Sequence, residues 1–270
     1  MRKILILTLC AFCLILTGCS EKKYDFSSEY LVVGMECAYA PFNYAENVST
    51  PTNVKVEGAS FYVDGYDVEI ALLIGKALGK KVKIKMIEWE SLITELKTGN
   101  IDLIIAGMSP TEVRKKQIIF SDGYYRTTHV VLMKKDAKYT SATKLTDFNG
   151  ARGVGQIETL YDTLLDQLPG ITHQEPLNDV GLITTAIKSG TADIAILEKP
   201  VAEAIIASNE TLTYVELDEN FNVKEEDIIV SIGLRKSDKE LASKVNDALK
   251  NISDDKRNEI MLTHVRKQAE

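Results

Sequence analysis

Residues 96–105 (LKTGNIDLII) and residues 187–196 (IKSGTADIAI) repeat one pattern within the chain of 270 residues. In each stretch, a lysine, a small hydroxyl residue and a glycine are followed by an aspartate that leads into an apolar run. A glycine just past the end of a helix readily adopts the left-handed conformation that terminates it. A short apolar run after such a signal is typical of a buried strand. Each stretch therefore predicts a helix that ends at glycine and leads into a buried strand.

The chain around both stretches alternates strands and helices, which is typical of an α/β fold with parallel sheets. In the first part, Asp67 is the expected N-cap of a helix that Gly79 ends. Near the end, the capping box 237–240 predicts a helix with Leu241, Val245 and Leu249 inward, and we expect this helix to return to the first part. The predicted strands are 30–34, 82–87, 101–106, 129–133, 152–156, 192–197 and 228–234, and the other predicted helices are 91–98, 159–168, 179–189 and 201–208.

The hydrophobic content of 45% is enough for one large core or two smaller ones. Two similar α/β lobes would explain the repeat, although helix–glycine–strand punctuation also recurs by chance in α/β proteins. Ligands of open α/β sheets bind beyond the carboxyl ends of the strands. The segments 107–114 and 198–200, which follow the two repeated strands, are therefore the first candidates for a binding site.

The N-terminus has the pattern of an export signal. A basic start is followed by an apolar run over residues 4–16, which is too short to span a bilayer. The next residues, Leu16-Thr17-Gly18-Cys19, resemble the lipobox of bacterial lipoproteins. This resemblance implies a signal peptide over 1–18, cleavage before Cys19, lipidation of Cys19 and anchoring to the outer face of the cell membrane, with residues 19–28 as anchor and flexible linker. An ordinary signal peptide with an incidental cysteine is the alternative.

Cysteine content and charge limit the function classes. Cys10 and Cys13 would leave with the signal, and with Cys19 lipidated only Cys37 remains, so no intramolecular disulfide is expected. The net charge is −7, and it becomes more negative when the signal leaves. An acidic chain argues against nucleic acid as a partner and against electrostatic docking on anionic lipid.

Several motifs together carry a resemblance to a known family. They are MECAYAPFNY (35–44), GYDVEIA (65–71), LKTGNIDLIIAGMSPTEVRKK (96–116), FSDGYY (120–125) and ADIAILEKPVA (192–202). The chain resembles the family 3 extracellular solute-binding proteins of bacterial ABC importers, in the polar amino-acid branch. The resemblance implies a two-lobed, type II periplasmic-binding-protein-like fold, in which each lobe is a sheet flanked by helices. Two crossing strands would join lobe 1 (29–125 plus 232–270) to lobe 2 (126–231).

The same resemblance implies the function. The two lobes would close by a hinge motion over one amino acid, and the monomeric protein would deliver it to a membrane permease and its ATPase. No cofactor and no metal are expected. The resemblance places Arg114 and Ser109 on the α-carboxylate, which a guanidinium can grip with two parallel hydrogen bonds. It places Glu198, where the family commonly has Asp, on the α-ammonium.

Further candidates surround these groups by the same resemblance. Tyr39 and Trp89 match aromatic positions that sandwich the substrate side chain, and Ala106 and Gly107 would offer backbone groups. Gln156 and Thr159 match the second lobe's loop before its helix, and Glu36 matches a position that reaches the side-chain end. Glu158 stands where many relatives have Gly, so either it points away or it contacts the far end of a cationic substrate. The other site candidates are Glu36, Tyr39, Trp89, Ala106, Gly107, Gln156 and Thr159.

The acidic candidates favour a basic substrate. A buried unpaired carboxylate is costly, so Glu36 beside Glu198 predicts arginine or lysine, with glutamine, histidine or cystine as alternatives. A dehydratase-type enzyme is a minor alternative, since some relatives have that activity. However, the three histidines lie outside the pocket motifs, no cluster has metal spacing and no G-x-S-x-G turn occurs.

A sensory ectodomain is also disfavoured. Residues 45–64 are expected to form a polar flap over the cleft mouth.

Overall fold

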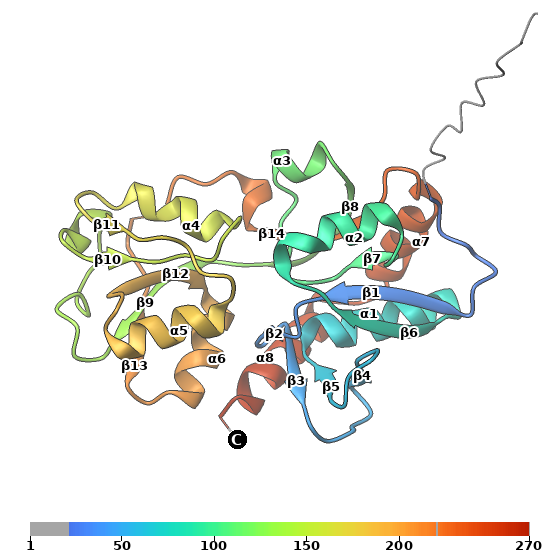
Figure 1. The fold of residues 1–270 in the computed structure, drawn as a ribbon, viewed down its shortest axis with the longest axis horizontal. Coiled ribbons are helices and arrows are strands. Elements are labelled where there is room, and N and C mark those ends of the chain that lie inside the picture. Colours follow the sequence, from blue (N-terminus) through green and yellow to red (C-terminus); the bar gives the residue numbers. More distant parts are fainter. Residues whose placement is uncertain (1–21, 220, 270) are drawn as a thin grey trace, which may run out of the picture.

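The computed structural model describes residues 22–219 and 221–269. The predicted signal peptide and Cys19 lie outside the described residues. Two α/β lobes lie side by side in Figure 1, and each is built around its own five-stranded sheet. The strand order is β6-β1-β7-β14-β8 in the first lobe and β11-β10-β12-β9-β13 in the second. The predicted two-lobed fold class is therefore confirmed.

The first lobe contains most of the N-terminal half of the chain. Its β1 pairs in parallel with β6 and β7, whereas β14 pairs antiparallel with β7 and β8. Its elements are β1 (Tyr30–Met35), β2 (Ala38–Tyr39), β3 (Asn43–Glu46), β4 (Val54–Lys55), β5 (Tyr62–Asp64), α1 (Tyr66–Leu78), β6 (Lys81–Met86), the 3-10 turn η1 (Trp89–Ser91), α2 (Leu92–Thr98), β7 (Leu103–Ile104), α3 (Glu112–Lys115) and β8 (Ile119–Arg126).

The second lobe repeats the alternation of strands and helices. The helix predicted over 159–168 is split into a short α-helix and a 3-10 turn. The elements are β9 (His129–Lys134), η2 (Leu145–Phe148), β10 (Arg152–Gly153), α4 (Leu160–Leu164), η3 (Leu165–Gln167), β11 (Thr172–His173), α5 (Val180–Ser189), β12 (Ile194–Glu198), α6 (Lys199–Ser208), β13 (Leu212–Val215) and η4 (Glu225–Ile228).

The chain passes between the lobes twice, and the two passages lie together. β8 leads out of the first lobe, and β14 (Ile229–Leu234) leads back into it. These two strands pair from Ile229 with Arg126 to Leu234 with Ile119. Thr127 also donates a backbone hydrogen bond of 3.0 Å to Ile228. Paired crossing strands of this kind are suited to a hinge.

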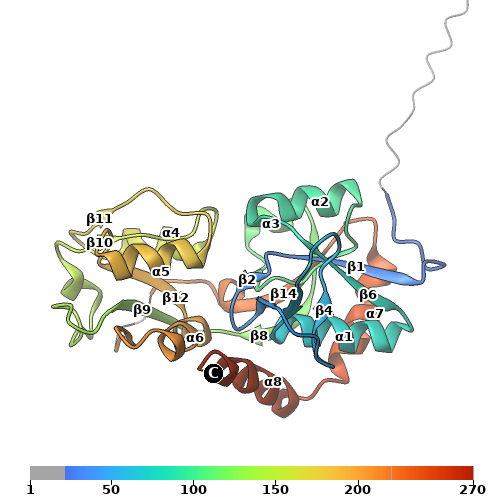
Figure 2. The ribbon, with the colours of Figure 1, turned by 60° about the horizontal axis from the view of Figure 1, so that its bottom comes forward.

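The C-terminal helices α7 (Lys239–Lys250) and α8 (Asp254–Lys267) finish the chain. As expected, α7 returns to the first lobe, where it packs on α1 and β8. The helix α8 contacts α1 of the first lobe and also α6 of the second, and Figure 2 shows it below the junction of the lobes. Its buried His264 is hydrogen-bonded to Tyr44 at 2.9 Å and Glu69 at 2.8 Å, both in the first lobe.

Two predicted helix caps are wrong, and for the same reason. The helix α1 begins after Gly65, not at Asp67, and the Asp67 carboxylate is buried where it accepts hydrogen bonds from Asn43 and Tyr124. Gly65 is needed there, because a Cβ atom would lie 2.3 Å from the carbonyl oxygen of Phe42. The expected capping side chain is therefore bonded to partners far along the chain, and the same is found at the start of α7.

At the second of these caps, α7 begins after Asp238 without a side-chain cap from it. The Asp238 carboxylate instead pairs with Arg235 at 2.6 Å and accepts the backbone N–H of Tyr24 at 2.8 Å. The hydroxyl of Ser237 donates to the carbonyl of Lys22.

Two further expectations differ from the structure. Residues 45–64 do form strands, in a four-stranded sheet of order β2-β3-β5-β4, but Val56 bridges to Ile84 of the edge strand β6 and the segment does not line the cleft. Residues 22–28 are not a free linker, because Tyr24 is buried in the first lobe and its hydroxyl donates to the carbonyl of Tyr30. No helix among the described residues is long and apolar enough to cross a membrane.

Candidate functional site

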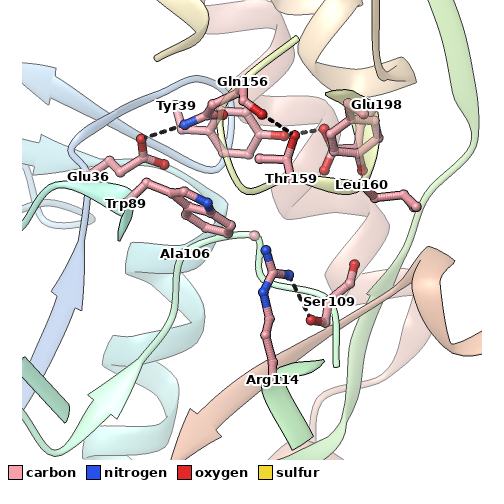
Figure 3. Close-up of a pocket in the computed structure, with 12 residues that line it drawn as sticks. Glu36, Tyr39, Trp89, Ala106, Ser109, Arg114, Gln156, Thr159, Leu160 and Glu198 are labelled. Carbon is pink, nitrogen blue, oxygen red and sulfur yellow. Dashed lines mark hydrogen bonds between the residues drawn. The ribbon is translucent and has the colours of Figure 1, made fainter. Parts of the chain in front are cut away.

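One cavity lies between the lobes, and all ten ligand-site residues predicted from the sequence line it (Figure 3). The space measures about 370 Å³ when open solvent at its edge is included, but only about 20 Å³ of it would admit the centre of a water molecule, so the side chains nearly fill it in this form. Its lining residues are Glu36, Tyr39, Trp89, Ala106, Gly107, Ser109, Arg114, Gln156, Thr159, Leu160, Tyr161 and Glu198. The structure thus brings the ten candidates together, and their contact with a ligand stays a prediction.

The first lobe contributes the loop that follows β7. Ala106, Gly107 and Ser109 come directly after this buried strand, at the edge of the sheet where its carboxyl end lies. Gly107 has a φ of 64° and lies against Tyr39, since a Cβ atom there would be 2.9 Å from the Tyr39 ring. A residue other than glycine would therefore be strained and would also push Tyr39 out of place.

Arg114 is held across the mouth of the cavity. It sits in α3, whose N-cap residue Thr111 accepts its backbone N–H. Its guanidinium lies over the Trp89 ring, with Cζ 4.9 Å from the centroid, which is cation–π distance. It donates to the backbone carbonyl of Ser109 at 2.9 Å in its own lobe and of Glu158 at 3.0 Å in the other. Burial lowers the pKa of Arg114 to about 10, so the side chain is still a cation at neutral pH.

The two aromatic candidates form walls of the cavity. Trp89 is 8% exposed and Tyr39 is 7% exposed. The Tyr39 ring stacks on Phe42, with centroids 5.4 Å apart and an angle of 9° between the planes. Phe42 itself is fully buried and packs in the core. In this position the Tyr39 hydroxyl reaches the carboxylate of Glu198 in the second lobe.

Glu198 is the acid of the second lobe. It is the last residue of β12 and is only 1% exposed. Tyr39 from the first lobe donates a hydrogen bond to its carboxylate, and the hydroxyl of Tyr161 is a second donor. Burial raises the pKa of Glu198, and the two tyrosine donors partly offset this effect. A carboxylate held in this way is a prepared site for a cation.

Glu36 is the acid of the first lobe, and it faces Gln156 of the second. The Gln156 amide donates to the Glu36 carboxylate at 3.0 Å and to the carbonyl of Asn178, also at 3.0 Å. Burial raises the pKa of Glu36 to about 8, and the hydrogen bond from Gln156 opposes this increase. The negative charges of Asp179 and Glu88 raise it further. At neutral pH this carboxyl group therefore gains from a cationic neighbour.

Thr159 and Glu158 form the loop before α4. Thr159 is the N-cap of this helix, where its hydroxyl accepts the N–H of Asp162 and donates to the carbonyl of Gln156 at 2.7 Å. Glu158 has a φ of 57° and an exposed side chain that does not line the cavity. Of the two expectations for Glu158, the structure favours the one in which the side chain points away. Its backbone carbonyl takes part in the site instead, as the acceptor for Arg114.

Sequence reasoning missed Leu160 and Tyr161. Both lie in the first turn of α4, directly after Thr159. One sequence signal was available, because Tyr161 is an aromatic residue two positions after the predicted site residue Thr159. However, the predicted helix over 159–168 did not show which of its sides faces the first lobe. The cavity thus has two carboxyl groups, one from each lobe, and a single guanidinium.

A known protein family matches the sequence over most of its length. Residues 31–266 match the family model of bacterial extracellular solute-binding proteins, family 3. The chain is 32% identical over 257 residues to the arginine-binding extracellular protein ArtP of Bacillus subtilis, and the alignment covers 94% of each chain.

Solved structures give the same picture. The amino acid ABC transporter substrate-binding protein AbpA of Streptococcus pneumoniae, bound to L-arginine, has a TM-score of 0.77 and 25% identity, with 90% of this chain and 98% of that chain covered. An ancestral arginine-binding protein bound to glutamine has a TM-score of 0.72 and 26% identity, with 88% of this chain and 99% of that chain covered. With a family model that spans nearly the whole described chain, this protein belongs to the bacterial extracellular solute-binding proteins, family 3.

Proposed function

We propose that this chain is the exported substrate-binding component of an ABC importer and that it captures a basic L-amino acid, arginine or lysine, between its two lobes. The observation behind this proposal is the charge of the cavity, in which Glu36 and Glu198 face one guanidinium, that of Arg114. A basic amino acid carries one carboxylate and two cations, so it pairs with all three groups. The similarity to arginine-binding relatives supports the same substrate class.

Each group has a role in this proposal. Arg114 and Ser109 bind the α-carboxylate, with Thr159 from the other lobe beside them. Glu198 binds the α-ammonium, for which the hydroxyls of Tyr39 and Tyr161 help to hold the carboxylate in place. Glu36, held by Gln156, meets the cationic end of the side chain. Trp89 and Tyr39 lie against the aliphatic stem, and Ala106 and Gly107 let the backbone approach it. A charge-assisted hydrogen bond contributes about twice as much as a neutral one.

Capture requires closure of the two lobes. The first lobe supplies Arg114 and Glu36, and the second supplies Glu198 and Gln156, so only the closed form offers every contact. A ligand can shift an opening equilibrium only by its difference in affinity for the two forms. The paired strands β8 and β14, where Arg126 pairs with Ile229, are the place where a hinge would bend.

The rest of the proposal concerns the route of the ligand. The protein is anchored as a monomer to the outer face of the cell membrane by a lipid on Cys19, and its closed form docks on a permease driven by an ATPase. In this proposal the first lobe is 29–125 plus 232–270 and the second lobe is 126–231. Glutamine, histidine and cystine are the alternative substrates, and a dehydratase is the alternative function.

Equilibrium dialysis with radiolabelled arginine and lysine tests the proposal. The full-length protein is first unfolded and refolded to remove any ligand that it carries. Binding of one equivalent and recovery of the unchanged amino acid are expected. Recovery of a chemically altered ligand would favour an enzyme, and saturation by glutamine or cystine in preference to arginine and lysine would overturn the basic substrate class.

A further inference from the structure

Exposed lysines gather on the first lobe where the described chain begins. Lys22 donates from its side chain to the carbonyl of Gly99 at 2.7 Å, and its own carbonyl accepts from Ser237 at 3.0 Å. Three segments therefore meet at this point: residues 22–28, which we call the N-terminal strap, the end of α2 and the loop before α7. Each of these segments has exposed lysines, and we refer to the resulting cluster as the entry patch. Its members are Lys22, Lys23, Lys97, Lys116, Lys236 and Lys239.

Contacts tie the outer members to the same surface. Lys236, adjacent to Ser237, donates to the carbonyl of Lys116 at 2.6 Å. Lys116 directly follows α3, and Lys97 lies in the last turn of α2. In Figures 1 and 2 the helices α2 and α3 lie on the same side of the first lobe. The lysines thus form one surface although they come from four separate stretches of the chain.

The acids of these stretches do not neutralise the entry patch. Asp102 and Asp238 both pair with Arg235, which is only 2% exposed, so one of their two negative charges is balanced inside the lobe. Glu95, which accepts a hydrogen bond from the neutral Asn100 amide, and Glu240, 3.9 Å from Lys244, keep their negative charges, but the acids of these stretches are fewer than the six lysines. The patch is therefore locally cationic on a chain whose net charge is −7. The net charge, which argued against docking on anionic lipid, does not represent this surface.

We propose that the entry patch rests on the anionic surface of the membrane to which the chain is anchored. Only Ser20 and Glu21 separate Cys19 from Lys22, so at about 3.5 Å per residue a lipid on Cys19 lies within roughly 10 Å of the patch. This distance is close to the Debye length of about 8 Å at physiological ionic strength. Basic residues held so near an anionic leaflet are attracted to it.

The packing of the N-terminal strap on the first lobe fixes where the lipid anchor leaves the lobe. Tyr24 is buried, and Lys80 donates to the carbonyls of Phe26 and Ser28, both at 2.6 Å. The anchor therefore cannot swing freely around the lobe and instead meets the membrane at the patch. Because Lys116 directly follows α3, which contains Arg114, this orientation also holds the cleft mouth close to the bilayer. The inference rests on the anchor of the proposed function, but not on the identity of the amino acid.

Lysine footprinting on vesicles tests the proposal with the full-length lipidated protein. The protein is reconstituted on vesicles of phosphatidylcholine alone and of phosphatidylcholine with phosphatidylglycerol, and each lysine's acetylation rate is measured by mass spectrometry. We expect Lys97, Lys116 and Lys236 to react several-fold more slowly on the anionic vesicles, and Lys188 of the second lobe to react equally on both. High salt should remove the difference. Equal rates for the patch lysines on the two kinds of vesicle would overturn the proposal.

A pair of charge-matched variants separates the patch from net charge. The triple variant K97E/K116E/K239E keeps Lys236 as a reporter, and K55E/K135E/K144E changes the net charge by the same amount at exposed positions elsewhere. Protection of Lys236 should be lost in the first variant and kept in the second. The same outcome in both variants would contradict the proposal.

Flotation and ligand binding distinguish the possible failures. Protein that floats with neutral vesicles is bound through its lipid anchor. Protein that floats with anionic vesicles but not with neutral ones would be bound through the entry patch without an anchor. Flotation with neither kind would overturn the inference. A thermal shift with arginine on the same samples reports the amino-acid site independently of these results.

Discussion

Gln156 of the second lobe donates a hydrogen bond of 3.0 Å to the carboxylate of Glu36 in the first lobe. This contact joins the lobes at the end of the cavity away from Arg114 in Figure 3. A buried carboxyl group with one amide donor is incompletely satisfied, because a carboxylate accepts several hydrogen bonds. The cationic end of a basic amino acid is the partner that would complete it.

Replacement of Glu36 should therefore change the substrate preference. In E36Q the volume and a hydrogen bond with Gln156 can be kept, but the negative charge is lost. We expect the affinity for arginine and lysine to fall by roughly 10- to 100-fold, since a hydrogen bond to a charged group contributes about 1.5–3 kcal/mol. Affinity for glutamine should fall less or rise. Titration calorimetry of both ligands checks this, and an equal loss for both would refute the role of Glu36.

The raised pKa of Glu36, about 8, predicts a pH dependence of binding. A cationic ligand stabilises the ionised carboxylate, so the complex binds fewer protons than the free protein between the pKa values of the two states. Affinity for arginine should thus rise with pH up to about 8 and then level off, by at most about tenfold per pH unit. E36Q should show a flatter profile. A wild-type affinity that falls as the pH rises from 5 to about 8 would contradict the sign of this linkage.

The same shift affects the protein without ligand. The folded pKa of Glu36 lies above its unfolded value, so the folded form binds more protons between the two values and stability falls as the pH rises through this window. Asp67, whose pKa burial raises to about 7, acts in the same direction. In urea titrations, the free energy of unfolding of E36Q should fall less with rising pH than that of the wild type. The part of the fall that is due to Asp67 should persist.

Loss of Arg114 should abolish tight binding of every amino acid. R114A removes both donors to the α-carboxylate, and we expect a loss of about 100-fold or more, from two charge-assisted hydrogen bonds. K115A is the matched control, because Lys115 is partly exposed and pairs with Glu112 at 3.2 Å and Glu226 at 2.6 Å. It should bind as the wild type does. Wild-type affinity in R114A would remove the basis of the proposed site.

Glu158 should matter through its backbone and not through its charge. Its exposed side chain leaves the cavity and its carbonyl accepts from Arg114. Arginine affinity in E158Q and E158G should stay within about twofold of the wild type, which is well under 1 kcal/mol. The glycine variant relieves a positive φ, which offsets the entropy that glycine gains in the unfolded chain. Weaker arginine binding in E158Q, with unchanged glutamine binding, would show that the carboxylate contacts the ligand.

Docking of the N-terminal strap predicts a stability effect outside the site. Y24A removes a ring that is 8% exposed and packs in the first lobe, so we expect the free energy of unfolding to fall by about 2–4 kcal/mol. K23A changes the exposed neighbour and should have little effect. Urea unfolding of the full-length chain measures both, and equal stability of Y24A and K23A would mean that the strap does not dock.

Local signals in the sequence predicted much of this fold. Gly79, Gly99 and Gly190 were expected to end helices, and each is the left-handed residue at the end of its helix. These positions depend on backbone sterics within a few residues. Asp67 and Ser237 failed as predicted caps because their partners, such as Tyr124 and Lys22, are distant in the sequence. Local propensity does not include such partners.

The site was predictable only in part. Motifs shared with a family located ten residues of the cavity, including Glu36 and Glu198, without any knowledge of their contacts. Tyr161 was missed because its role depends on how the short helix α4 is rotated. The positive φ of Glu158 was missed because a glutamate gives no local signal for it.

The central claim is that a basic amino acid is captured between the lobes, and a thermal-shift panel on refolded protein tests it most directly. The panel contains arginine, lysine, histidine, glutamine, cystine and glutamate. A ligand at a thousand times its dissociation constant stabilises the folded form by about 4 kcal/mol, which is a large shift. We predict that shift for arginine or lysine, and none for glutamate, which the two carboxyl groups repel. A large shift with glutamine or cystine and none with arginine or lysine would contradict the account.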